Sequence, residues 1–362
     1  MKIFINSRFL TQSITGVQRY AIELVKALDA LLESGEIDRA HVSFVLLAPK
    51  GICHELDLRH ISVEQVGILK GHLWEQFELP LFSRGHLLLN CCNTGPVFKR
   101  NQIVTICDAS VFACPSGYSK AFRMWYKFLL PILGRQAKVI ITISDFSKSE
   151  LIKYCDISPN KITTTLLGVE NPAELELDES VLNKYSLNTT PYLFAVSSMN
   201  PNKNFAALAR AIKMLGDVKF KVVIAGGSNS KVFADKATSL PAFVTQVGYV
   251  TDPELQALYK HATGFVYPSL YEGFGLPPLE AMAHGCPVIV SNVASLPEVC
   301  GDAALYCDPH SSADIAEKIM RLMGDEALRD DLRRNGLLHV QKFTWEKCAR
   351  ETWDVIDEVL SR

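Results

Sequence analysis

The stretch YPSLYEGFGLPPLEAMAHGCPVI, residues 267–289, contains a complete pattern of strand, loop, helix and strand. Its first apolar run ends near Pro268, and the loop that follows contains Gly273 and Gly275. Two consecutive prolines then suit the first turn of a helix, where a missing backbone N–H costs nothing. His284 and the glycine after it end that helix, and the next strand begins at once. The stretch therefore predicts one repeat of a parallel α/β sheet.

The start of the helix predicted here would present free backbone N–H groups at the carboxyl end of the preceding strand, which suits a diphosphate. Glu272 and Glu280 flank this turn. A carboxylate accepts two hydroxyl hydrogen bonds at once, so the two side chains suit a sugar and a ribose diol. The structural alternative is a plain helix-entry loop with Glu280 exposed on the helix surface.

Apolar runs alternate with amphipathic stretches outward from this segment through both halves of the chain. The alternation predicts an α/β fold of two doubly wound parallel sheets. The predicted strands are 1–6, 42–48, 103–106 and 139–143, then 192–196, 221–225, 264–267, 288–291 and 304–307. The predicted helices are 17–32 and 146–154, then 204–215, 253–261, 277–284 and 312–323.

An acidic stretch without a sustained apolar stripe, residues 171–190, predicts a linker between two domains at 1–170 and 191–343. Residues 344–362 predict a capped amphipathic helix with Thr344 as its N-cap, and packing back on the first domain is one option for it. We expect the two domains to face each other across a cleft, with ligands at the carboxyl ends of the strands.

The composition excludes several classes of protein. The 362 residues are 48% hydrophobic and 21% charged, which is typical of a globular chain, and the net charge of −2 argues against a nucleic-acid binder. The ten cysteines lack metal-finger spacing and favour free thiols in a reducing cytosol. No apolar run reaches the roughly 20 residues of a membrane span, and the first residues lack the apolar core of a signal peptide. We therefore expect a cytoplasmic protein without a metal site.

The first half of the chain leaves room for a peripheral membrane contact. Residues 1–170 carry 19 Lys and Arg against 15 Asp and Glu, and residues 118–138 mix aromatic with basic side chains. Such a stretch suits an anionic membrane surface or a lipid-diphosphate acceptor. A helix packed on the core, with a basic outer face, is the alternative.

The segment EGFGLPPLEAMAHGCPVIVSN, in which seven residues separate Glu272 from Glu280, resembles the signature of glycosyltransferase family 4, of the two-Rossmann (GT-B) fold. Weaker similarities follow in the family's order: TGVQRYAIELVKAL at 15–28, WEQFELP at 74–80, TICDASVF at 105–112, ITISDFSKSEL at 141–151, SSMNPNKN at 197–204 and GYVTDPELQALY at 248–259. The resemblance is greatest to the branch that makes bacterial surface polysaccharides. It implies sugar transfer with retention, without a metal or a cofactor, from a nucleotide-sugar held mainly by the second domain.

The resemblance also implies roles for residues of the signature segment. Glu272 takes the place of the glutamate that holds a hydroxyl of the transferred sugar. Glu280 takes the place of the glutamate that grips the ribose. The main-chain amides of Phe274, Gly275 and Leu276 would face the donor sugar and its phosphates.

Four further positions match the family outside that segment. Lys203 stands where the family has a lysine on the diphosphate, and it would counter the charge that develops on the leaving group. Gly16 opens a helix and lets the backbone approach a phosphate. Gly248 and Val250 would line the base pocket. The structural alternatives are a solvated lysine at Lys203, a plain turn at Gly16 and an ordinary loop at Gly248 and Val250.

Two departures from the family's pattern stand out. The arginine that usually precedes the lysine by five residues is Ser198 here, and Asn202 stands where some members have an arginine directly before the lysine. The usual His-Asp pair at a strand end is Cys107-Asp108. A thiol is a weak hydrogen bonder, which leaves Asp108 as the candidate polar group at the reaction centre, or else as a turn-capping residue.

These patterns predict a retaining, metal-independent hexosyltransferase of bacterial O-antigen or capsule synthesis, with GDP-mannose as the first choice of donor. The expected acceptor is a glycan or a polyprenyl-diphosphate-linked glycan, and the expected place is the cytoplasm or the inner face of its membrane. A dTDP-rhamnose or UDP-hexose donor is the alternative within the class. A catalytically weakened scaffold subunit is an alternative from another class, because Cys107 and Ser198 replace typical polar residues. A sugar-nucleotide epimerase of the same fold is a third alternative, but the loop of the signature segment argues against it.

Overall fold

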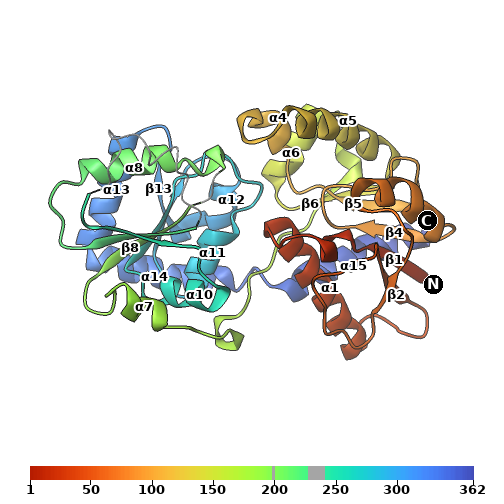
Figure 1. The fold of residues 1–362 in the computed structure, drawn as a ribbon, viewed down its shortest axis with the longest axis horizontal. Coiled ribbons are helices and arrows are strands. Elements are labelled where there is room, and N and C mark those ends of the chain that lie inside the picture. The colour runs from red at the N-terminus through yellow and green to blue at the C-terminus, as the bar shows by residue number, and fades with distance from the viewer. Residues whose placement is uncertain (198–199, 227–240) are drawn as a thin grey trace. The chain divides into compact units, whose positions relative to one another are not determined.

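The computed structural model describes residues 1–197, 200–226 and 241–362, and the chain forms two compact units. The first unit comprises Met1–Gly168 and Phe343–Arg362, and the second comprises Val169–Lys342. Each unit is a parallel sheet with helices on both faces (Figure 1). Ser198 lies outside the described residues. In the described part of the chain, no helix is long and apolar enough to cross a membrane.

The first unit contains a seven-stranded parallel sheet in the order β3-β2-β1-β4-β5-β6-β7. The central strands are apolar because helices cover both of their faces. The order reverses between β1 and β4, which are neighbours in the sheet. The strands are β1 Lys2–Asn6, β2 Ser43–Ala48, β3 Ser62–Gln65, β4 Leu87–Asn90, β5 Gln102–Thr105, β6 Val139–Thr142 and β7 Ile162–Thr164.

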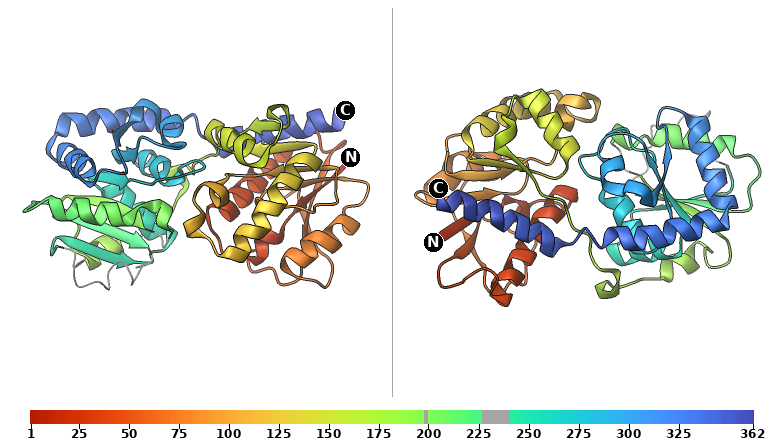
Figure 2. Two further views of the ribbon diagram at one scale, coloured as in Figure 1. Left: turned by 90° about the horizontal axis from the view of Figure 1, so that it is seen from above. Right: turned by 180° about the vertical axis from the view of Figure 1, so that it is seen from behind.

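Helices pack on both faces of this sheet. The C-terminal helix α15 lies beside α1 (Figure 2). Its Trp345 contacts Tyr20 of α1, and its Trp353 contacts Phe44 of β2. Thr344 is its N-cap, as predicted, and accepts a hydrogen bond from the Lys347 amide at 3.1 Å. The helices are α1 Gly16–Ser34, α2 Gly71–Leu73, the π-helical η2 Trp74–Glu78, α3 Leu79–Phe82, α4 Ser110–Ala113, α5 Lys120–Gln136, α6 Asp145–Cys155 and α15 Trp345–Ser361.

The second unit contains a six-stranded parallel sheet in the order β10-β9-β8-β11-β12-β13. Short 3-10 turns, such as η6 Pro201–Lys203, join some of its elements. The strands are β8 Tyr192–Ser197, β9 Lys221–Gly226, β10 Val244–Gly248, β11 Gly264–Tyr267, β12 Val288–Ser291 and β13 Ala304–Cys307. The helices are α7 Ser180–Lys184, α8 Phe205–Met214, α10 Asp252–His261, α11 Leu276–Ala283, α12 Leu296–Cys300, α13 Ser312–Gly324 and α14 Glu326–Val340.

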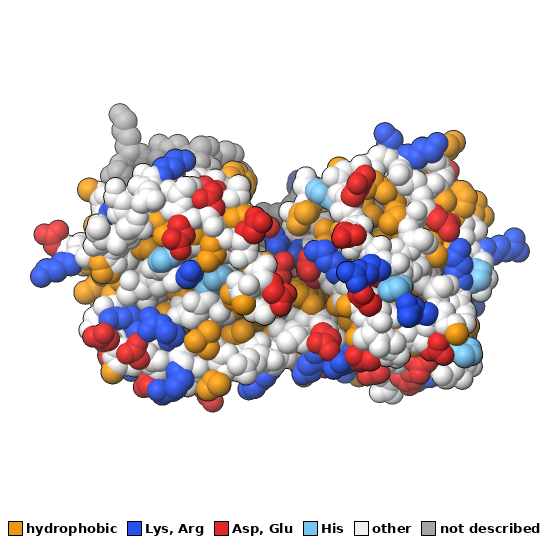
Figure 3. All heavy atoms as spheres, turned by 90° about the horizontal axis from the view of Figure 1, so that it is seen from below, with side chains coloured by type: hydrophobic (Ala, Val, Ile, Leu, Met, Phe, Trp, Pro, Cys, Tyr) orange, Lys and Arg blue, Asp and Glu red, His pale blue; other side chains and the backbone are white. Residues whose placement is uncertain are grey.

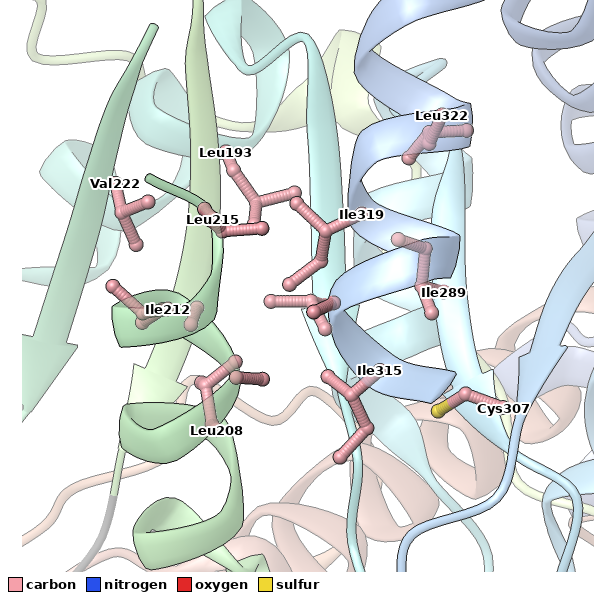
Figure 4. Packing of buried hydrophobic residues seen from close by; sticks show 14 of the residues in the cluster. Leu193, Leu208, Ile212, Leu215, Val222, Ile289, Cys307, Ile315, Ile319 and Leu322 are labelled. Atoms are coloured by element: carbon pink, nitrogen blue, oxygen red, sulfur yellow. The ribbon is translucent and has the colours of Figure 1, made fainter. Parts of the chain in front are cut away.

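The core of the second unit forms where α8 and α13 cover one face of the sheet. Leu208 and Ile212 of α8 point toward Ile315 and Ile319 of α13, with Leu193 of β8 beneath them (Figure 4). These side chains repeat at intervals of four residues along each helix, so they form one buried stripe. The core thereby fixes the strands whose carboxyl ends bear the polar residues described below.

The boundary between the units differs from the predicted linker. Residues 171–190 belong to the second unit, and they contain α7, which packs against α10. Val181, Leu182 and Leu187 are buried there, so a few apolar residues fix this segment without a long stripe. On the face drawn in Figure 3, basic and acidic side chains alternate, in keeping with a net charge of −2.

Candidate active site

The loop between β11 and α11 ends at a residue that must be glycine. Gly275 is the N-cap of α11 and has a φ of +117°. A Cβ at this position would lie 2.7 Å from Leu296 Cδ2, so a side chain would add steric overlap to backbone strain. The glycine lets the chain turn directly into α11, whose first N–H groups lack intrahelical acceptors.

Ser295 fixes the orientation of the peptide groups in this loop. Its buried Oγ lies 3.0 Å from the carbonyl oxygen of Glu272 and 2.7 Å from that of Phe274. The C=O and N–H of a trans peptide point in opposite directions, so the amides of Gly273 and Gly275 are directed away from Ser295. Pro277 and Pro278 in the first turn of α11 have no N–H, so the turn presents the amides around Gly275 and Leu276, and a helix N-terminus suits an anion.

Lys203 and Glu272 form an ion pair beside that turn. Lys203 Nζ lies 2.7 Å from Oε1 and 3.0 Å from Oε2 of Glu272, and it also donates to the hydroxyl of Tyr267 at the end of β11. The Lys203 side chain is 25% exposed and that of Glu272 12%. Ser269 Oγ donates to the same Glu272 carboxylate. The structure thus brings together two predicted site residues that lie 69 positions apart.

Hydrogen bonds between two loops place Lys203 there. The Asn202 carbonyl oxygen accepts from Ser269 Oγ at 2.8 Å and from the Leu270 amide at 2.7 Å. Asn204 adopts a φ of +57°, and its Nδ2 donates to the Pro268 carbonyl oxygen at 2.9 Å. Asparagine tolerates this left-handed conformation better than most residues. The contacts of Asn202, where an arginine is found in some members of the resembled family, are thus made by its main chain, and they hold this loop beside Lys203.

Glu280 lies on α11 and contacts a buried tyrosine. Tyr259 donates its hydroxyl to Glu280 Oε2 at 3.3 Å. Burial raises the pKa of Tyr259 and of Tyr267 well above the usual value, and the nearby glutamates raise both further. Both tyrosines are therefore neutral donors at physiological pH. At the other end of the helix, burial lowers the pKa of His284, whose Nδ1 donates to the Glu280 carbonyl oxygen at 2.9 Å.

The remaining predicted residues of the second unit lie farther along the sheet. Gly248 ends β10 and Val250 follows it, and β9 and β8 separate this edge strand from β11. Gly248 has a φ of +73° and sits at a bulge in the pairing with β9. A base pocket at these residues remains a prediction.

Gly16 and Asp108 belong to the first unit. Gly16 is the first residue of α1, and a Cβ there would meet no atom within 4 Å, so the fold itself does not require glycine. Asp108 follows β5, and its Oδ1 accepts from the Ser110 amide at 2.7 Å, as a turn-capping residue does. The neighbouring Cys107 is buried, and its amide donates to Asn93 Oδ1 at 2.7 Å. Burial, followed by the charge of Asp108, raises the pKa of the Cys107 thiol.

Sequence reasoning missed the groups that hold the predicted residues in place. Tyr267, Ser269 and Ser295 were given no role, although the first two lie just before the signature segment. A polar residue at the end of a buried strand was the available signal for Tyr267. Ser295 had no such signal, because only the fold brings it under the loop.

Comparisons with known proteins agree with this geometry. Residues 179–339 match the family model described as Glycosyl transferases group 1. The chain is 33% identical to the O-antigen chain mannosyltransferase B of Escherichia coli, with 97% of this chain and 98% of the relative covered. It is 26% identical to the O-antigen chain mannosyltransferase RfbU of Salmonella typhimurium, with 85% and 87% covered. A sucrose-phosphate synthase from Thermosynechococcus elongatus shares the fold, with a TM-score of 0.75, 20% identity and 99% of both chains covered. The chain therefore belongs to the group 1 glycosyltransferases, a retaining family of GT-B fold that transfers a sugar from a nucleotide-activated donor to a glycan acceptor.

Proposed function

We propose that this enzyme transfers mannose from GDP-mannose to a growing O-antigen glycan, which a polyprenyl diphosphate carries. The choice of sugar is supported by the 33% identity, over nearly the whole chain, to an O-antigen chain mannosyltransferase. The observation that carries the chemistry is the Lys203–Glu272 pair beside the N-terminal turn of α11. It combines a cation for a diphosphate with a carboxylate for sugar hydroxyls.

Each site residue has a proposed task. Glu272 accepts hydrogen bonds from the donor sugar, and Lys203 counters the charge of the departing diphosphate. The amides of Phe274, Gly275 and Leu276 face the sugar and phosphates. Glu280 holds the ribose, while Gly248 and Val250 border the base. In the first unit, Gly16 and Asp108 serve the reacting groups.

The proposed reaction needs no strong protein base. The bond between sugar C1 and the phosphate oxygen breaks as negative charge gathers on the diphosphate, where Lys203 stabilises it. The acceptor hydroxyl bonds to C1 from the same face, and its proton passes to the released phosphate oxygen. Configuration at C1 is therefore retained, in keeping with a site that has Asp108 but a buried thiol in place of the family's histidine.

A donor panel tests the proposed function. The purified chain is incubated in excess EDTA with GDP-mannose, dTDP-rhamnose or a UDP-hexose and an α-linked mannotriose acceptor, and products are resolved by mass spectrometry. We expect mannosylated product with GDP-mannose alone. Product from another donor would change the sugar assignment, and transfer restored only by Mg²⁺ or Mn²⁺ would refute the metal-independent mechanism. Absence of transfer with every donor would favour the scaffold alternative.

Replacing Glu280 with alanine is expected to raise the KM for the donor about 10-fold or more while kcat changes little. A ribose contact is made equally in the ground and transition states, and a hydrogen bond to a charged group is worth about 1.5–3 kcal/mol. Steady-state kinetics with varied donor measure this. Glu280→Gln is the control for folding, because it keeps an oxygen for the buried Tyr259 hydroxyl. An unchanged donor KM in Glu280→Ala would remove Glu280 from the ribose site.

Replacing Cys107 with alanine is expected to keep at least about half of the activity. The raised pKa keeps the buried thiol neutral, so it is a poor nucleophile. Initial transfer rates check this, and iodoacetamide should label the exposed Cys53 well before Cys107. An inactive variant that still binds donor, or a sugar covalently attached to Cys107, would contradict the mechanism above.

We further propose that α5 rests on the membrane that carries the acceptor. Met124 is 72% exposed and Phe128 59%, and the exposed Lys120 and Lys127 lie on the same helix. Exposed apolar side chains with basic neighbours suit an anionic lipid surface. Sedimentation with phosphatidylglycerol vesicles should fall at least several-fold in Met124→Ser/Phe128→Ser. A matched substitution of the exposed Leu338 of α14 should leave it unchanged, and equal losses in both variants would argue against a specific face.

A further inference from the structure

A buried ion pair lies in the first unit, apart from the residues assigned above. Arg8 Nε donates to Glu75 Oε1 at 3.2 Å, and Arg8 Nη2 donates to Thr94 Oγ1 at 3.0 Å. The Glu75 side chain is fully buried, and that of Arg8 is only 9% exposed. The same carboxylate accepts from Asn6 Nδ2 at 2.9 Å and from Thr94 Oγ1 at 2.7 Å, and His72 Nδ1 lies 3.1 Å from its other oxygen.

This carboxylate is ionised despite its burial. Burial alone would raise the pKa of Glu75, but the hydrogen bond from His72 and the charge of Arg8 lower it below its usual value. Replacing a buried ion pair by apolar residues of similar volume is often neutral or stabilising, so the stability of the unit does not by itself account for this pair. An oriented guanidinium is what the network provides.

The pair stands where a doubly wound sheet binds ligands. Asn6 ends β1 and Asn90 ends β4, and Asn6 Nδ2 donates to Asn90 Oδ1 at 3.0 Å. These neighbouring strands are the point at which the strand order reverses, and ligands of such sheets bind at the carboxyl ends there. Glu75 comes from η2, a π-helical turn, and such turns are frequent at functional sites.

The guanidinium of Arg8 keeps donor capacity beyond these contacts. Within the described residues no hydrogen-bond acceptor pairs with its Nη1, and the exposed part of the side chain reaches the surface. Helix α5 adjoins this network, because Trp125 contacts His72 at 5.6 Å between ring centroids and His72 contacts Glu75. Tyr126 stacks on Phe122 at 4.2 Å between ring centroids, and Phe122 stacks on Tyr118 at 5.3 Å.

We propose that Arg8 donates hydrogen bonds to a hydroxyl of a neutral acceptor saccharide, and that Glu75 is the positioning residue that orients its guanidinium. The exposed edge of this aromatic row on α5, where Phe122 is 39% exposed, offers apolar contacts to a pyranose ring. A neutral saccharide fits better than a phosphate because the Arg8–Glu75 pair has no net charge to balance an anion. The assignment rests on the proposed function in taking the acceptor to be a glycan.

Four variants of the full chain separate acceptor binding from folding. Arg8→Lys keeps the charge but loses the planar fork. Glu75→Gln leaves Arg8 buried without a counter-charge, so its Tm should fall by roughly 10 °C. Arg8→Gln/Glu75→Gln removes both charges and should recover most of that loss. Arg350→Gln breaks an exposed pair with Glu36 in the same unit and is the matched control.

Kinetics with GDP-mannose and α-linked mannotriose provide the first readout. We expect the acceptor KM to rise at least 10-fold in Arg8→Lys and in the double variant, with the donor KM within twofold of wild type. Arg350→Gln should match wild type in both. A double variant that regains both Tm and acceptor KM would show that the pair serves the fold alone, and would overturn the proposal.

Saturation-transfer NMR of mannotriose provides a second readout, which needs neither donor nor turnover. The wild-type chain should give a signal that Arg8→Lys lacks. Equal signals from both would overturn the assignment of Arg8 even if the enzyme transfers mannose. If transfer fails with every donor but the signal still depends on Arg8, the acceptor site stands and the proposed donor does not. Loss of the wild-type signal on addition of 10-fold excess inorganic phosphate would show an anion site instead.

Discussion

Replacing Lys203 with alanine is expected to lower kcat/KM by about 10²–10³-fold, or about 3–4 kcal/mol, on the scale of a lost oxyanion-hole donor. The diphosphate gains charge as the bond to the sugar breaks, so the effect falls mainly on kcat. In this unit Lys203 is the lysine that pairs directly with the carboxylate of Glu272, in the loop between β11 and α11. We therefore expect its loss to exceed that of any single change in the loop between β11 and α11.

Steady-state kinetics with GDP-mannose measure this effect, and Lys260→Ala is the control. Lys260 lies on the surface of the same unit, 3.6 Å from Glu179, in a pair of little energetic consequence. Its substitution should leave kcat/KM within twofold of wild type. Glu272 keeps the Ser269 hydroxyl as a donor in Lys203→Ala, so the variant should still fold. Wild-type activity in Lys203→Ala would mean that another cation counters the leaving group.

The strands that sequence analysis located are the buried ones. Parallel strands covered on both faces must be apolar along their whole length, so β1, β2 and β11 differ clearly from their surroundings. The edge strands β3 and β10 escaped, because β3 is SVEQ with all four residues exposed and β10 is largely part-exposed. β4 is buried and as long as β6 and β11, but its sequence is LLLN, and leucine favours a helix where the β-branched and aromatic residues of β6 and β11 favour a strand.

The helix α14 was missed for a different reason. It spans Glu326–Val340, yet within it only Leu332 and Gly336 are buried, so it carries almost no apolar stripe. Its packing against α11 involves Gly336, whose missing Cβ allows close approach to Met282. A helix held by such a close contact leaves little periodic signal in the sequence.

The candidate site was predictable in its residues but not in its contacts. Family resemblance pointed to Lys203, Glu272 and Glu280, and the structure brings the first two within 2.7 Å. Nothing in the spacing of the chain indicates that Lys203 also donates to the Tyr267 hydroxyl, or that Ser295 holds the loop from another element. Those contacts form because β8 and β11 end, and α12 begins, at the same edge of the sheet, which is a property of the fold.

Replacing Glu272 with glutamine is expected to lower kcat/KM by about 10–100-fold, less than the loss of Lys203. The amide keeps the shape of the side chain but accepts weaker hydrogen bonds from sugar hydroxyls, at a cost of about 1.5–3 kcal/mol. It also frees Lys203 from its counter-charge, so the lysine is more available to the diphosphate. The donor KM should therefore change little, and the loss should appear in kcat when donor and acceptor are varied in turn.

The double variant Lys203→Ala/Glu272→Gln decides whether the two side chains act as a unit. In the free enzyme they neutralise each other at 2.7 Å, and in the reaction they are proposed to separate onto sugar and diphosphate. If binding of the donor has to break their pairing, removing Glu272 costs less once Lys203 is absent, and the two losses will not add. We expect the double variant to lose no more than about threefold beyond Lys203→Ala. Strict additivity would mean that each residue meets the donor independently, and that the ion pair has no influence on catalysis.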